Sequence, residues 1–292
     1  MDEPSREIAQ RRLGIGLLVA SIGLIACSDA IAKAMTASVP VTQIALVQAT
    51  VMVTGVPLLA RERRLLSLVR TRRPWLQLVR SACHLGSGLC FYTAVKYLPL
   101  AETIAIIFVG PLLVTVLAAL VLREHVGPRR WTACLVGLAG AMVVVRPGAD
   151  GLGWVALYPL AATTLHAVYV VCTRALAPTE HTATMLTYSA LPSVVVLGLA
   201  APWFWVAPGA VGWVALVGIG VIACVSVVLA IRAYALAPAS LLAPYSYVEI
   251  VFGSVLGLVL FGDVPDAMTV LGAGIIVASG LYVYHREARA RG

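Results

Sequence analysis

The sequence predicts an all-α integral membrane protein with ten transmembrane helices, arranged as two inverted five-helix repeats. Its composition, its long apolar segments and a weak internal repeat all indicate this class. Of the 292 residues, 61% are apolar and only 12% are charged, whereas soluble domains have about 45–50% and 25%. These few charges could not give a soluble domain of this length a polar surface.

Ten apolar segments have about the length that a bilayer requires. Crossing ~30 Å of hydrocarbon takes ~20 helical residues, and irregular backbone facing lipid is too costly. The expected spans are 13–34, 40–60, 75–96, 101–122, 131–146, 152–175, 184–202, 211–235, 240–262 and 268–284. The fifth and tenth are short and need flanking residues. A lipid-spanning β-barrel would instead alternate in polarity over ~10-residue segments.

Basic residues collect in loops on one side of this arrangement. They cluster at the N-terminus, in Arg61–Arg73, in Arg123–Arg130 and in Arg286–Arg291. Cytoplasmic loops carry such an excess, so we expect a multi-pass protein of a bacterial inner membrane with both termini cytoplasmic. The net charge of +8 is then an orientation signal aided by anionic lipid. Membrane lipid, rather than nucleic acid, is the expected partner.

The six cysteines all lie inside expected spans, and none forms a C-x-x-C pair. They are typical of small apolar residues, so we expect no disulfide frame, no metal site and no cofactor. Arg11-Arg12 and the following apolar run resemble a signal peptide ending at Cys27. Because the apolar segment continues past Cys27 and nine further spans follow, we expect an uncleaved first helix.

An internal repeat appears when the chain is shifted by 139 residues, which places Ala94–Ala101 on Ala233–Ser240. Both segments join two spans through an x-Pro link. Each half has five spans, so the second half enters the membrane from the opposite side. We expect repeats at 13–146 and 152–284, flanked by cytoplasmic segments 1–12 and 285–292. Inverted repeats are typical of secondary transporters, whose substrate site lies near the midplane between the halves.

Charged side chains inside the spans are the first candidates for function, because each costs ~2.5–3.5 kcal/mol at a helix centre. Glu249 lies in the middle of the expected span 240–262, where desolvation favours a protonated carboxylate. It is a candidate for substrate binding and proton coupling, or for a structural pair with Arg232. Asp29 and Lys33 are four residues apart and share a helix face. They could bind a zwitterion or neutralise each other.

Aromatic and imidazole side chains form a second candidate set for substrate contact. His84 and Tyr92 are eight residues apart on the third span, and His166 and Tyr169 are three apart on the sixth. Tyr245, Tyr247 and Tyr188 could line a cavity and stack on a planar solute, or lie at the membrane interface as tyrosines near span ends often do. The alternative for each histidine is a satisfied hydrogen-bonding residue within the bundle.

Five further charged residues are candidates for structural or gate roles. Glu102 is expected in the first turn of its helix, where a carboxylate complements the helix dipole. Arg123 and Glu124 lie at a cytoplasmic helix end, and Lys96 lies one turn beyond Tyr92. Arg232 is the alternative partner of Glu249.

Small residues recur every fourth position on two spans, in Ala82-Gly86-Cys90-Ala94 and Gly253-x-x-x-Gly257. Such stripes let helices approach closely in lipid. We interpret them as packing faces.

Several short motifs occur in a characteristic order. They are Asp29-x-x-x-Lys33, Tyr97-Leu98-Pro99-Leu100-Ala101-Glu102, Gly110-Pro111-Leu112, Arg123-Glu124, Val126-Gly127-Pro128-Arg129-Arg130-Trp131, Gly137-x-x-Gly140 and Arg146-Pro147-Gly148. With the span count, they resemble the drug/metabolite transporter superfamily, and within it the EamA-type ten-helix branch. The second half departs from the pattern, with Asp263 in place of the usual glutamate. The resemblance implies a plasma-membrane carrier of small organic solutes, often an exporter of amino acids or other metabolites.

The expected function is therefore alternating-access transport of a small organic metabolite, with export of an amino acid or similar metabolite as the first hypothesis. The alternative is import of a planar vitamin or nucleoside-like solute, since some relatives of this type resemble importers of riboflavin or S-adenosylmethionine. A channel is less favoured, because its filter usually forms in an oligomer. A remote alternative is an intramembrane serine hydrolase using Ser87 and His84. No Walker loop is present, so we expect no ATP hydrolysis and no enzyme activity. A homodimer is left open.

Overall fold

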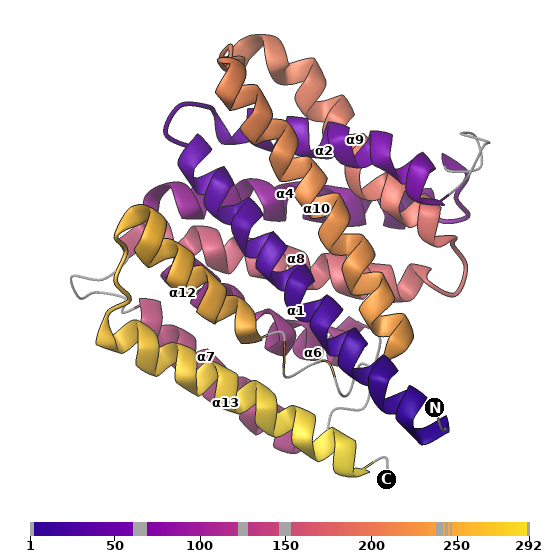
Figure 1. Cartoon of the computed structure of the whole chain (residues 1–292), viewed down its shortest axis with the longest axis vertical. Helices are drawn as coiled ribbons and strands as arrows, with labels where there is room; N and C mark the ends of the chain where they lie inside the picture. Colours follow the sequence, from indigo (N-terminus) through magenta and orange to yellow (C-terminus); the bar gives the residue numbers. More distant parts are fainter. Residues whose placement is uncertain are drawn as a thin grey trace.

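The computed structural model describes residues 3–60, 69–121, 128–145, 153–237, 242, 245 and 247–290. The regular elements in these ranges are all helices (Figure 1). They are α1 (Glu3–Met35), α2 (Val41–Ala60), α4 (Pro74–Tyr97), α5 (Leu100–Ile107), α6 (Gly110–Val121), α7 (Pro128–Val145), the 3₁₀ turn η1 (Gly153–Ala156), α8 (Leu157–Leu176), α9 (Thr182–Phe204), α10 (Ala210–Leu236), α12 (Val248–Phe261) and α13 (Ala267–Ala290).

These helices match the ten expected spans, with α5 and α6 forming one span together. Five spans are long and apolar enough to cross a membrane: they lie in α1, α5–α6, η1–α8, α9 and α10. Shorter apolar stretches lie in α2, α7, α12 and α13. The remaining span, α4, has 24 residues and carries more polar side chains, including Arg80 and His84.

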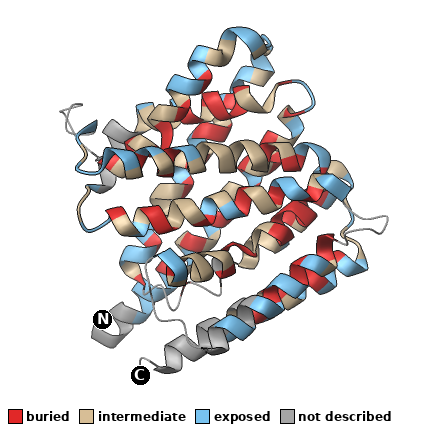
Figure 2. Ribbon diagram, turned by 180° about the vertical axis from the view of Figure 1, so that it is seen from behind, coloured by how far each residue is buried: buried red, intermediate tan, exposed pale blue. Residues whose placement is uncertain are grey.

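Large apolar side chains cover much of the outer surface. Leu199, Val211 and Val259 are 72%, 84% and 72% exposed, and Figure 2 shows exposed residues along the outward faces of the helices. An apolar surface of this extent indicates contact with lipid.

The helix packing follows the inverted repeat. Helix α1 packs along α10, and α8, which holds the place of α1 in the second half, packs along α4, the counterpart of α10. Helices α2 and α7 each pack against their own counterparts, α9 and α13. The beginning of α1 and the end of α13 lie at one end of the bundle in both overall views (Figures 1 and 2). An even number of spans requires this arrangement.

Polar and small residues bring paired helices together. Ser21 donates to the carbonyl of Ser226 at 2.8 Å, and Ser226 donates back to the carbonyl of Ser21 at 3.1 Å. Between α7 and α13, a Cβ added to Gly140 would lie 2.9 Å from the carbonyl oxygen of Gly272. Close backbone approach at small residues is a usual packing device in lipid.

The fourth span of the first half is interrupted. Helix α5 ends before Phe108, and α6 begins at Gly110, just before Pro111, which lacks an amide hydrogen and disfavours a helical residue before it. In the second half, α12 begins at Val248, and most of the expected span 240–262 before this residue lies outside the described residues. Interrupted helices place helix ends inside the membrane, where they can face a substrate.

Candidate functional site

Two carboxylates, one from each repeat, meet inside the bundle. Asp29 lies on α1 and Glu249 on α12, both half-buried, and they are within electrostatic range of each other. Neither has a hydrogen-bond or ion-pair partner among the described residues. The prediction that Glu249 lies in mid-helix is wrong, because it falls in the first turn of α12. There its carboxylate lies at the positive end of the helix dipole.

Tyr92 completes this group from α4. Its hydroxyl donates to Gln48 Oε1 on α2 at 2.6 Å, its side chain is buried, and it lies within electrostatic range of Asp29. We call Asp29, Gln48, Tyr92 and Glu249 the carboxylate cluster. It joins four helices and holds acids without a basic partner in the described part of the chain.

The imidazole and phenol rings predicted on the third and sixth spans form a second group. The Tyr169 ring lies 4.9 Å from that of His84 and 5.6 Å from that of His166. The guanidinium of Arg80 lies over the same tyrosine ring, 5.0 Å from the Tyr169 centroid. We call Arg80, His84, His166 and Tyr169 the aromatic cluster. Its rings offer stacking surface to a planar solute.

Open space lies between the two clusters on the face of α4 that both share. Arg80, His84, Gly88 and Tyr92 are spaced four apart and so lie along one helix face. A Cβ added to Gly88 would meet no heavy atom within 4 Å. Because His84 and Tyr92 contact other helices on either side of Gly88, this space faces the interior of the bundle.

Helix α8 indicates accessible space on its inner side as well. Residues two apart point in nearly opposite directions, about 200° apart around a helix. Thr164 and His166 are nevertheless both exposed, so α8 is accessible on two sides. His166 faces the Tyr169 ring, so its exposure is on the side of the aromatic cluster.

An aromatic contact joins the break between α5 and α6 to the beginning of α12. The rings of Phe108, at the break between α5 and α6, and Tyr247, just before α12, lie 5.3 Å apart. Tyr245, one of the predicted stacking residues, instead packs against the apolar cluster around Leu18 and Leu242. Its neighbour Tyr247 is the tyrosine at this contact.

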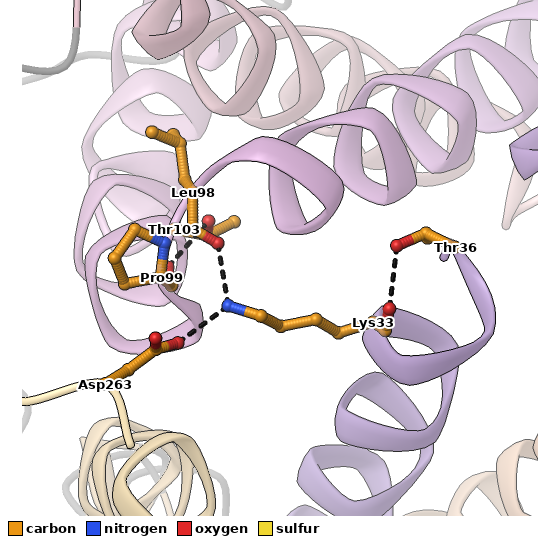
Figure 3. A network of polar contacts seen from close by, with 6 residues as sticks. All are labelled: Lys33, Thr36, Leu98, Pro99, Thr103 and Asp263. Atoms are coloured by element: carbon orange, nitrogen blue, oxygen red, sulfur yellow. Dashed lines mark hydrogen bonds and ion pairs between the residues drawn. The ribbon is translucent and has the colours of Figure 1, made fainter. Parts of the chain in front are cut away.

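Lys33 does not pair with Asp29. Its ammonium donates to Asp263 Oδ2 at 2.7 Å and to the carbonyl of Leu98 at 3.0 Å (Figure 3), and it lies 4.9 Å from the Phe261 ring centroid. The bridge ties the end of α1 to the end of α4 and to the segment after α12, so it crosses between the repeats. The long lysine side chain reaches a partner beyond its own helix, which helical spacing alone does not reveal.

The other charged candidates lie apart from the two clusters. Lys96 is exposed, with its ammonium 5.3 Å from the Tyr97 ring centroid, so it does not extend the stripe of His84 and Tyr92 inward. Glu102 is buried in the first turn of α5, as expected. Arg232 is exposed on α10 and forms no ion pair with Glu249. Arg123 and Glu124 lie outside the described residues.

Ser87 has a packing role that explains it without nucleophilic chemistry. Its hydroxyl donates to the carbonyl of Ala162 on α8 at 2.8 Å, and a Cβ added to the neighbouring Gly86 would lie 3.0 Å from Leu165. His84 stacks on Tyr169 instead. The serine hydrolase alternative has no support here, and the small-residue stripe packs α4 on α8 as predicted.

Sequence reasoning missed two charged residues. Arg80 lies six residues inside the expected third span, and the absence of nearby acids in that span was a usable signal. Asp263 was noted only as the residue that replaces the family's usual glutamate in the second half. Its role depends on a tertiary contact with Lys33, for which the sequence gives no spacing signal.

This arrangement of an inverted helical repeat around paired intramembrane clusters defines a multi-pass membrane transporter rather than an enzyme. The chain belongs to the EamA-like transporter family, whose family model matches residues 12–146 and again residues 153–284. Both halves of the predicted repeat are thus members of one family, and the predicted relationship to the drug/metabolite transporters is confirmed.

Named relatives agree on transport and differ in substrate. The chain is 31% identical to a riboflavin transporter of Vibrio cholerae, over 70% of this chain and 69% of the relative. It is 27% identical to an S-adenosylmethionine uptake transporter of Rickettsia bellii, over 76% of each chain. It is 27% identical to a pseudopaline exporter of Pseudomonas aeruginosa, over 91% of this chain and 94% of the relative. A solved crystal structure with 21% identity has the same fold, with a TM-score of 0.67 over 96% of this chain and 99% of that one.

Proposed function

We propose that the protein is an alternating-access carrier of a small organic solute that contains a planar ring and binds together with a positive charge, either its own ammonium group or a coupled proton. The observation that carries this proposal is the pair Asp29 and Glu249, two intramembrane carboxylates without a basic partner in the described part of the chain. Uncompensated charge in a membrane is costly and marks functional sites. A substrate ammonium or a proton would supply the missing positive charge.

The aromatic cluster supports the planar part of the proposed solute. His84, His166 and Tyr169 present rings across the space beside Gly88. A solute bound by the carboxylate cluster at one end could stack on these rings at the other. Riboflavin and S-adenosylmethionine both contain such a planar ring system, and named relatives transport them.

The proposed cycle opens the site to each side of the membrane in turn. With both termini cytoplasmic, as the distribution of basic residues favours, the Lys33–Asp263 bridge lies at the extracellular end and closes it. The last turn of α8, the counterpart of α1, carries Arg174, which is exposed and has no partner among the described residues. The basic residue in the last turn of α1 thus closes one end, while the basic residue in the last turn of α8 forms no such bridge with a described residue, which supports an inward-facing state.

The test is uptake of labelled solute by the full chain in proteoliposomes, with riboflavin, S-adenosylmethionine and pooled amino acids supplied separately. Flux is measured in both directions, with and without a pH gradient. We expect flux of at least one solute above empty liposomes, and loss of that flux in Glu249→Gln. The matched control is Glu180→Gln, since Glu180 binds Thr71 and the amide of Arg72 in a loop contact away from the site. Flux that survives Glu249→Gln and falls in Glu180→Gln would contradict the assignment.

A further inference from the structure

Arg80 is a buried arginine on the face of α4 that carries His84, Gly88 and Tyr92. Its side chain is fully buried and lies between α4, α8 and α9. Its guanidinium lies over the Tyr169 ring, which both histidines also contact, and its charge is within electrostatic range of His84. It is therefore part of the proposed site and not of a cytoplasmic loop.

All recorded acceptors of this guanidinium are neutral. Nε donates to Gln77 Oε1 at 3.1 Å, Nη1 donates to Thr173 Oγ1 at 3.4 Å, and Nη2 donates to the carbonyl of Met185. No acid of the described chain lies within ion-pair distance of it. A guanidinium has five N–H donors, and a buried charge normally needs an opposite charge as well as hydrogen bonds.

Gln77, beside Arg80, has a buried hydrogen-bond donor without an acceptor. Its side chain is fully buried, its oxygen is used by Arg80, and its amide nitrogen Nε2 has no hydrogen-bond partner. The amide nitrogen and oxygen share one carbon, so this free donor lies beside the guanidinium. The Gln77 Nε2 group lacks an acceptor, and Arg80, whose acceptors are all neutral, lacks an anion. Buried donors left without acceptors are uncommon and need an explanation.

We propose that Arg80 and Gln77 form an anion subsite that binds a carboxylate or phosphate group of the transported solute. The inference rests on the proposed function and narrows its substrate class to solutes with an anionic group beside a planar ring. The ring would stack on Tyr169 and His166, and the anion would reach Arg80 as α4 moves against α8 and α9 during the cycle. A carboxylate accepts two parallel bonds from arginine, and such charge-assisted bonds are about twice as strong as neutral ones.

Matched solutes that differ only in the anion test this subsite. Binding to the purified full chain in detergent is measured by calorimetry for S-adenosylmethionine against its decarboxylated form, and for flavin mononucleotide against riboflavin. We expect the anionic member of at least one pair to bind about tenfold tighter, the ratio that 1.4 kcal/mol gives. The preference should vanish in Arg80→Gln, persist in part in Arg80→Lys and remain intact in Arg73→Gln, which removes an exposed arginine of the loop before α4.

Gln77→Glu keeps the test decisive if Arg80→Gln does not fold. The new carboxylate would lie beside Arg80 and supply the missing anion from the protein itself, so the variant should fold and lose the preference. A structural role for Arg80 alone predicts that Arg80→Gln weakens both members of a pair equally. Equal affinities in the unmodified protein, or no binding of any of the four solutes, would overturn the subsite. Flux of another solute in proteoliposomes would in that case leave the proposed transport function standing.

Discussion

Asp29 and Glu249 are the residues on which substrate recognition depends most in this account. They come from different repeats, yet they are within electrostatic range and lack a basic partner in the described chain. We expect Asp29→Asn and Glu249→Gln each to lower flux of a cationic solute by about tenfold, because each removes a charge-assisted contact. Flux measured for the single and double variants should show non-additive losses, since the two sites interact. Fully additive losses would mean that the residues act separately.

The Lys33–Asp263 bridge is expected to hold one conformation rather than to bind solute. Removing one partner leaves a partly buried charge unpaired, which favours separation of the two ends that it joins. Asp263→Asn should therefore make the Lys33 end of the bundle accessible to a membrane-impermeant amine reagent at a severalfold higher rate. Reagent labelling followed by mass spectrometry measures this. Unchanged labelling in Asp263→Asn would indicate that the bridge does not close that end.

At this scale the sequence identified candidates better than it identified their partners. Asp29, His84, Tyr92, His166, Tyr169 and Glu249 were all recognisable as polar residues in apolar spans, and the structure brings them into two neighbouring clusters. The pairing of Lys33 with Asp263 was not predictable, because helical spacing favours Asp29. A contact between residues 230 positions apart follows from tertiary packing only.

Helix α4 contributes the face along which the site extends, and Gly88 keeps this face open. Gly88→Leu should fill the space and abolish transport with little loss of thermal stability, because the first added carbon, Cβ, would meet no heavy atom within 4 Å. Gly198→Leu on α9 is the matched control: a Cβ there also meets no atom within 4 Å, but Gly198 is exposed. Flux and unfolding temperature are measured for both. Normal flux in Gly88→Leu would exclude this space from the substrate path.

The contact of α12 with α5 depends on a missing side chain. A Cβ added to Gly253 would overlap the Ile104 side chain, and both residues are buried. Gly253→Ala should therefore destabilise the protein by about 1–3 kcal/mol through overpacking, and Ile104→Val should recover part of the loss. Denaturation in detergent checks both variants. Equal stability of Gly253→Ala and the unmodified protein would show that α12 and α5 can separate at little cost.

Elements were predictable where hydrophobicity extends over a whole span. The ten segments follow from span length, and the small-residue stripes of α4 and α12 pack as predicted, through Gly86 against Leu165 and Gly253 against Ile104. The interruption of the fourth span in the first half was missed. An apolar composition continues through Phe108, so hydropathy does not register the break between α5 and α6.

The whole molecule is a pair of similar halves that face opposite ways, and its function follows from this arrangement. The repeat was visible in sequence as a shared x-Pro link, and both halves match one transporter family. The carboxylate and aromatic clusters, where we propose that solute binds, each contain residues of both halves. The only ion pair that the structure records between described residues joins the halves at one end. Such a molecule should exchange solutes one for one, because the site opens to one side at a time.

The most direct test of this claim is counterflow in proteoliposomes that contain the full chain. Liposomes are loaded with unlabelled solute, diluted into a trace of the same labelled solute, and sampled over time. An alternating-access carrier predicts a transient accumulation of label above equilibrium in the unmodified protein, and none in Gly88→Leu. Label that only approaches equilibrium, at a rate independent of the solute inside, would indicate a channel and contradict the account.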